Sequence, residues 1–268
     1  MQITPRPFGE VIGEGMTILG RVWRRFLAPA FWTSILLGAL TIAIVVATGA
    51  GDVLQLILTD PEVLESYTRE ELIETTLTLF QAGFLSVLLQ LLGTGFINLT
   101  VHRLVGSEIA GEPLGPREAT SKAFGRLLVL VVAGFLAFVS VFLGLIALII
   151  PGLWLAGCFT MISPVIALEN VGPVAALRRS FALVRGRWWP TIGFVLLVGL
   201  LGSVAAQLVQ LIAIPILAAG DVGIGTGLGF VVIVVVQDLV IAAIAVMTTV
   251  WYIDLRARKE PLLTSNLS

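Results

Sequence analysis

The sequence contains very little cysteine and histidine, and these shortages exclude whole classes of site. Its 268 residues include one cysteine, Cys158, and one histidine, His102. A single cysteine cannot form a disulfide within the chain or build a cysteine-rich metal site, and a single histidine excludes chemistry that needs two imidazole rings. From the sequence we therefore expect no metal ion and no cofactor.

Charge is also scarce. Charged residues make up 12% of the chain, whereas roughly a quarter of the residues of an ordinary soluble domain are charged. Hydrophobic residues make up 57% of the chain, and the mean hydropathy is +1.04. Water cannot be the solvent for most of such a surface, so the composition predicts an all-α, polytopic membrane helix bundle.

Long apolar runs predict six transmembrane crossings within a single domain, residues 1–260, followed by a cytoplasmic tail, residues 261–268. The crossings are expected at about 26–49, 77–101, 126–149, 152–168, 190–217 and 227–252. The first run is longer than the apolar part of a signal peptide and follows Glu10 and Glu14, so it is interpreted as a crossing.

Proline, glycine and capping residues predict where several helices begin and where the chain turns. Asp60-Pro61 resembles a helix start, and Thr68 with Glu71 has the spacing of a capping box. The loop at 104–125 is polar. Pro151-Gly152 predicts a tight turn that makes crossings three and four an antiparallel hairpin.

A basic helix precedes each pair of crossings, at 7–25, 115–126 and 172–188. We interpret these helices as amphipathic and interfacial, which gives three repeated hairpin units. The clearest stripe, in the third unit, consists of Val174, Leu177, Phe181, Val184 and Trp188.

The basic residues fall almost entirely on one side of the predicted crossings. Of the 16 lysines and arginines, only Arg69 lies on the other side. The positive-inside rule then predicts a multi-pass protein of the cell membrane with both termini in the cytoplasm. This rule also explains the basic surface without nucleic acid. The remaining 15 are Arg6, Arg21, Arg24, Arg25, Arg103, Arg117, Lys122, Arg126, Arg178, Arg179, Arg185, Arg187, Arg256, Arg258 and Lys259.

One acidic residue, Asp238, lies near the middle of the sixth crossing. An ionised Asp at that depth costs roughly 2.5–3.5 kcal/mol, so it needs a partner. Depth counting along the helices places Gln207 opposite it, with Gln210 one turn away and Gln237 beside it. We predict an Asp238–Gln207 contact, direct or through water, which is either an interhelical clasp or a proton- or substrate-coupling site.

A second group of charges lies at the inner ends of crossings four and six: Glu169, Arg178, Arg179, Asp254 and Arg256. Charges at such a position commonly pair with one another, which predicts a structural cluster. The alternative is a surface that binds anionic lipid headgroups or a partner protein.

Two motifs carry a family resemblance that covers mainly residues 150–260. They read PGLW…SPVIALENVGPVAALRRSFALVRGRWW and TTVWYIDLRARKE. This pattern resembles the membrane domain of glycerophosphoryl diester phosphodiesterases and of related uncharacterised prokaryotic membrane proteins. The resemblance implies a six-helix bundle with interfacial helices. It implies no catalysis, because that family's activity belongs to a separate soluble barrel, and His102-Arg103 at a helix end is not a catalytic pair.

Three functions remain after these exclusions. The first is a non-catalytic integral membrane protein, a scaffold or accessory protein that contacts lipids, a membrane-protein partner or a second copy of itself. The alternative is a small transporter or channel with a polar track around Asp238, Gln237, Gln207 and Gln210. The third is an intramembrane enzyme, which the single deep carboxylate disfavours, because an aspartyl protease needs two facing carboxylates. We expect that the protein is not an enzyme.

Overall fold

The computed structural model of the chain describes residues 2–59, 62–63, 67–218 and 224–263, and these residues are mostly helical. The bounds of the helices are Phe8–Ala47 (α1), Ala50–Thr59 (α2), Arg69–Ala110 (α3), Pro116–Ala147 (α4), Ile149–Cys158 (α5), Ile162–Glu169 (α6), Pro173–Val184 (α7), Trp188–Ala218 (α8) and Ile224–Ala257 (α9). Two short strands, β1 (Gln2–Ile3) and β2 (Leu262–Leu263), pair antiparallel. This pairing holds the two ends of the chain together.

The predicted all-α polytopic bundle is confirmed. Among the described residues, six segments are long and apolar enough to cross a membrane: Phe8–Thr48, Arg69–Ala110, Pro116–Ala147, Ile149–Glu169, Trp188–Leu211 and Ile233–Ala257. They correspond in order to the six predicted crossings, and the chain is a multi-pass membrane protein by this criterion.

Two of the predicted interfacial helices are not separate elements. The region 7–25 and the first crossing form one helix, α1, and the region 115–126 likewise continues into the third crossing as α4. In α1 the buried positions continue at three- and four-residue spacing from Val11 to Leu37, so one stripe packs against its neighbours without a break. Only the third unit has a separate surface helix, α7, which ends before Gly186 at a φ of 91°.

The fourth crossing is broken, and its turn lies earlier than predicted. The chain reverses at Leu148, which has extended φ and ψ angles, while Pro151 and Gly152 lie inside the first turn of α5. Proline is tolerated there because the first N–H groups of a helix have no intrahelical partner. The buried Ser180 of α7 then hydrogen-bonds backbone groups at the break between α5 and α6. Its hydroxyl donates to the carbonyl oxygen of Cys158 (2.7 Å) and accepts from the N–H of Met161 (3.2 Å).

The second crossing begins as predicted but extends further. Thr68 and Glu71 form the reciprocal capping box, so α3 begins at Arg69. The helix continues through the region expected to be a polar loop and ends only at Gly111, whose φ of 84° suits glycine. The predicted helix start at Asp60-Pro61 lies outside the described residues.

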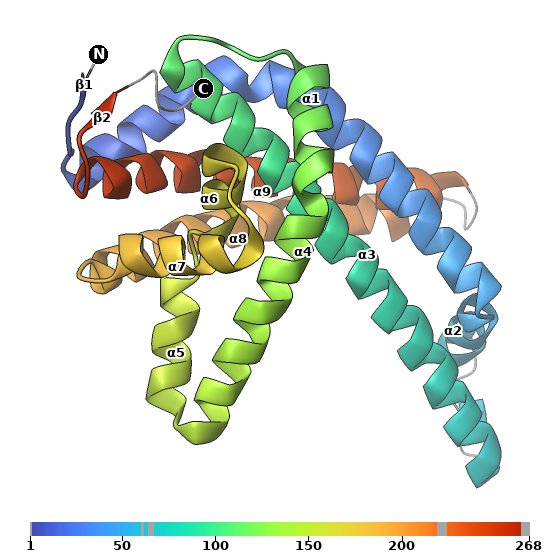
Figure 1. Cartoon of the computed structure of the whole chain (residues 1–268). Helices are drawn as coiled ribbons and strands as arrows, with labels where there is room; N and C mark the ends of the chain where they lie inside the picture. The colour runs from blue at the N-terminus through green and yellow to red at the C-terminus, as the bar shows by residue number, and fades with distance from the viewer. Residues whose placement is uncertain (1, 60–61, 64–66, 219–223, 264–268) are drawn as a thin grey trace.

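Three hairpins leave a shared bundle in different directions, as Figure 1 shows. α1 and α3 run together toward α2, α4 and α5 point downward, and α8 and α9 cross behind them. The core lies where α3, α6 and α9 meet near the chain ends, and its largest fully buried side chains include Trp251, Tyr252 and Phe194. The hairpins away from this core carry most of the exposed apolar side chains, as expected for a surface solvated by lipid.

Candidate functional site

The deep carboxylate is paired with a serine of the first crossing. Asp238 of α9 and Ser34 of α1 are each 2% exposed. The Ser34 hydroxyl contacts Asp238 Oδ2 and also the carbonyl oxygen of Ala30, at 2.7 Å. This contact joins two crossings that are far apart in the sequence but pack side by side.

The direct form of the predicted Asp238–Gln207 contact is not found between the described residues. Within the described residues, no hydrogen bond joins Asp238 to Gln207, and Gln207 and Gln237 are exposed on the bundle surface while Gln210 is half-buried. Depth counting failed because α1 also packs along α9, and a serine in an apolar run gives little signal. The only sequence signal for Ser34 was its position on the buried stripe of α1.

A second polar pair joins α9 to α3 with the same chemistry. His102 Nδ1 lies 2.7 Å from Thr249 Oγ1, and Thr249 donates its hydroxyl proton to the carbonyl oxygen of Ala245 (2.7 Å). Because a hydroxyl has a single proton, His102 is the donor to Thr249 through Nδ1–H in the tautomer in which Thr249 donates to Ala245. The Ser34 hydroxyl also has a single proton, so it donates to the carbonyl oxygen of Ala30 when a protonated Asp238 donates to the Ser34 oxygen.

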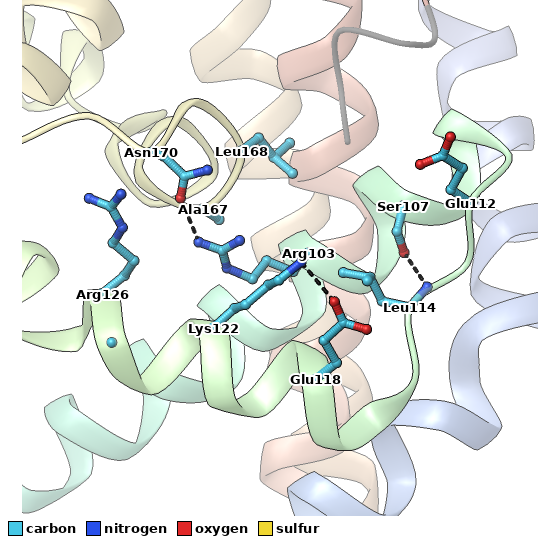
Figure 2. Close-up of a pocket in the computed structure, with 11 residues that line it drawn as sticks. Arg103, Ser107, Glu112, Leu114, Glu118, Lys122, Arg126, Ala167, Leu168 and Asn170 are labelled. Atoms are coloured by element: carbon cyan, nitrogen blue, oxygen red, sulfur yellow. Dashed lines mark hydrogen bonds and ion pairs between the residues drawn. The ribbon is translucent and has the colours of Figure 1, made fainter.

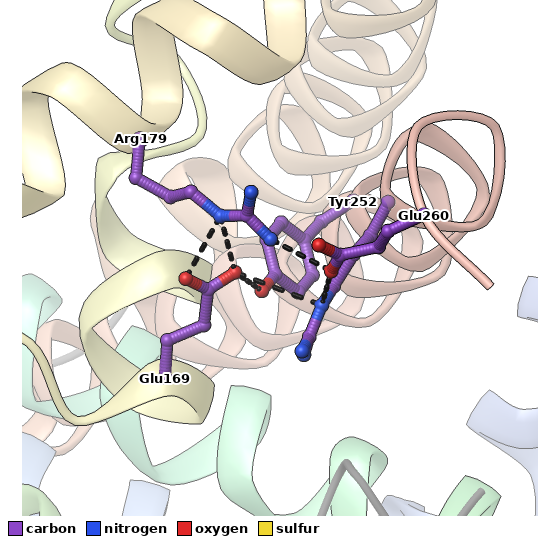
Figure 3. Close-up of polar contacts among 5 residues, drawn as sticks. Glu169, Arg179, Tyr252 and Glu260 are labelled. Carbon is purple, nitrogen blue, oxygen red and sulfur yellow. Dashed lines mark hydrogen bonds and ion pairs between the residues drawn. The ribbon is translucent and has the colours of Figure 1, made fainter. Parts of the chain in front are cut away.

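The predicted charge cluster exists in part, and Figure 3 shows its arrangement. Glu169, at the end of α6, accepts from Arg179 Nε of α7 (2.9 Å to each oxygen) and from the buried Tyr252 hydroxyl of α9 (2.6 Å). Arg256 Nε lies 3.8 Å from Glu169. Glu260, which we did not predict, accepts from both Arg179 (2.7 Å) and Arg256. The cluster therefore fastens α6, α7 and the end of α9 to one another.

Two predicted members lie outside this cluster. Asp254 instead pairs with Arg258 (2.6 Å) and accepts from the backbone N–H of Arg6 (2.8 Å), which ties the two chain ends together. Arg178 is exposed, and no ion pair joins it to the described residues. The helical turn explains both results, because adjacent residues on one helix point in different directions.

A polar hollow of about 630 Å³ lies between α3, α4 and α6. Figure 2 shows Arg103 of α3 near its centre, Lys122 and Arg126 on α4, and Asn170 on the opposite side. Arg103 donates to Asn170 Oδ1 (2.9 Å), while Lys122 is paired with Glu118 of its own helix (2.9 Å). Sequence analysis placed these cations on the inner side but did not bring them together.

A second hollow, of about 470 Å³, lies near the chain ends. Its lining includes three arginines, Arg6, Arg187 and Arg258, together with apolar Phe8 and Trp251. Basic side chains beside aromatic ones are typical of a membrane–water interface.

Comparison with known proteins finds no matching family model, no matching curated protein and no matching solved structure. In the described ranges, no group of three or more His, Cys, Asp or Glu side chains is arranged to hold a metal ion.

Proposed function

We propose that this chain is a non-catalytic integral membrane protein, a scaffold or accessory protein, that contacts anionic lipids or a membrane partner with its basic end. The Asp238–Ser34 pair is the observation that carries this proposal. It uses the most unusual polar residue of the crossings to hold α9 against α1. Interhelical hydrogen bonds of this kind commonly stabilise membrane bundles.

The arginines that line the two hollows support the proposed lipid contact. The hollows beside Arg103 and Arg187 are both lined by arginines, and the chain ends lie near the second one. Under the positive-inside rule this end faces the cytoplasm of a prokaryotic cell, where anionic headgroups attract basic side chains. The motifs at 151–189 and 248–260 support a relation to the membrane domain of glycerophosphoryl diester phosphodiesterases.

The test is whether Asp238 is sealed or hydrated. Infrared difference spectra of the protein in lipid, wild type against Asp238→Asn, would follow this carboxyl across pH and during deuterium exchange. A clasp predicts a carboxyl that stays protonated and exchanges slowly. Asp52→Asn is the matched control, because Asp52 is exposed in the first turn of α2, where water reaches its carboxyl group directly.

The opposite result supports a transporter. If the Asp238 carboxyl changes its protonation state with pH and exchanges quickly, a hydrated path reaches the middle of the bundle and the scaffold proposal is wrong. A coupling residue in a transporter needs such a path, whereas a packed clasp excludes it.

A further inference from the structure

The hollow between α3, α4 and α6 contains a buried arginine whose hydrogen-bonding capacity is only partly used. Arg103 is 8% exposed, and its Nε–H has no acceptor among the described residues. Among the described residues, its side-chain partner is the Asn170 oxygen, a neutral group. A buried guanidinium without an anion is costly, because charges in the interior need a charged partner and satisfied hydrogen bonds.

A second arginine faces the same hollow and adds to this charge imbalance. Arg126 makes no ion pair or hydrogen bond with the part of the chain that the structure describes, and its charge repels that of Arg103. Lys122 is neutralised by Glu118, and Figure 2 shows Glu112 on the far side of Ser107, away from Arg126. Among the described residues, therefore, no carboxylate lies within ion-pair distance of either guanidinium group.

The donors that line the hollow suit a phosphate group. Each guanidinium presents N–H donors in a fork that matches phosphate oxygens, and a tetrahedral phosphate accepts from several directions. Asn170 has a side-chain NH₂ that can donate as well, and it is held in the left-handed region (φ 53°) at the end of α6. The volume of about 630 Å³ leaves room for more than a bare anion.

We propose that the hollow between α3, α4 and α6 is a binding site for a phosphate group, held by Arg103, Arg126 and Asn170. The phosphate is either that of an anionic phospholipid headgroup or free phosphate. Phe124 and Leu128 of α4, 72% and 74% exposed, lie at the same level as Arg126, so headgroups can reach the site. If the phosphate belongs to a headgroup, the proposal rests on the lipid contact proposed above and assigns that contact to particular residues.

The experiment measures binding to the full-length protein purified in a zwitterionic detergent. One titration uses inorganic phosphate, and the other uses vesicles of phosphatidylcholine with added phosphatidylglycerol, compared with phosphatidylcholine alone. Arg126→Gln is the test variant, because Arg126 supports no other side chain. Arg117→Gln is the matched control, since Arg117 is exposed on the same helix but does not line the hollow.

Arg126→Gln is expected to weaken binding about tenfold, as the loss of one charge-assisted contact predicts, while Arg117→Gln leaves it unchanged. An effect on inorganic phosphate identifies a free anion site, and an effect on phosphatidylglycerol vesicles alone identifies a headgroup site. Equal effects of the two variants, or none, overturn the proposal. If the wild type still prefers phosphatidylglycerol in that case, the general lipid contact survives and only the site is wrong.

Discussion

Glu169 is the acceptor on which the inner end of the bundle converges, so replacing it with alanine tests how that end is held together. The side chain is 13% exposed and accepts from Tyr252 and Arg179, which belong to two other helices. Tyr252 is fully buried. Removing the carboxylate leaves this hydroxyl without its acceptor and leaves Arg179 and Arg256 with Glu260 as their remaining carboxylate partner.

The cost of Glu169→Ala has two parts, one from the buried Tyr252 hydroxyl and one from the partly exposed Arg179. A buried hydroxyl that loses its acceptor costs about 1–3 kcal/mol. Water can resolvate Arg179, whose side chain is 28% exposed, so the lost ion pair adds only about 0–1 kcal/mol. We expect Glu169→Ala to lower the free energy of unfolding by about 1–4 kcal/mol. Tyr252→Phe, which leaves the Glu169–Arg179 pair intact, should cost about 1 kcal/mol.

Equilibrium unfolding in mixed micelles with a denaturing detergent, followed by circular dichroism, measures these values. Glu118→Ala is the control, because Glu118 also pairs with a cation but both side chains are about half exposed, at 55% and 47%. It should cost no more than about 0.5 kcal/mol. The reasoning is refuted if Glu169→Ala costs no more than the control, or if Glu169→Ala and Tyr252→Phe are additive in the double mutant.

Two further predictions concern the α4–α5 hairpin and the end of α9. Gly152→Ala should destabilise the protein by about 1–3 kcal/mol, because the new Cβ would lie 2.6 Å from the backbone nitrogen of Leu145, whereas Gly134→Ala meets nothing within 4 Å and should be neutral in the same unfolding assay. Burial opposes the charged form of Glu260, but Arg256 and Arg179 lower its pKa below the ordinary value. Its stabilisation is therefore complete above the unfolded-state pKa and is lost as pH falls through the lower folded-state pKa. The melting temperature should fall below about pH 4 in the wild type and less steeply in Glu260→Gln, and equal slopes would contradict this assignment.

Hydropathy was enough to predict the six crossings, because each crossing needs a long apolar run whatever its neighbours are. The breaks between elements were harder, because they depend on contacts from elsewhere in the chain. Ser180 satisfies the break between α5 and α6 from a different helix, and nothing near Cys158 indicates this. The capping box at Thr68 was predictable because both of its members are local.

The site residues also differ in how far the sequence predicted them, and the reason is the same. Glu169, Arg179 and Arg256 were predicted together because the topology places the ends of α6, α7 and α9 at one interface. The partner of Asp238 was missed because it depends on which crossings are neighbours, and hydropathy carries no information about neighbours. Arg103 and Arg126 were likewise predicted to lie on one side, but their shared hollow depends on how α3 packs against α4.

The distribution of polar contacts explains why the hairpins can diverge. Lipid provides no hydrophobic force between helices, so association depends on packing and on polar contacts. Among the described residues, the ion pairs of Glu169, Glu260 and Asp254 lie beside the chain ends, and the pairs of Asp238 and His102 lie along α9. The tip of the α4–α5 hairpin has exposed apolar side chains that lipid can solvate, such as Ile146, Leu148 and Ile150. Helices fastened mainly at one end need not remain parallel at the other, which is the arrangement in Figure 1.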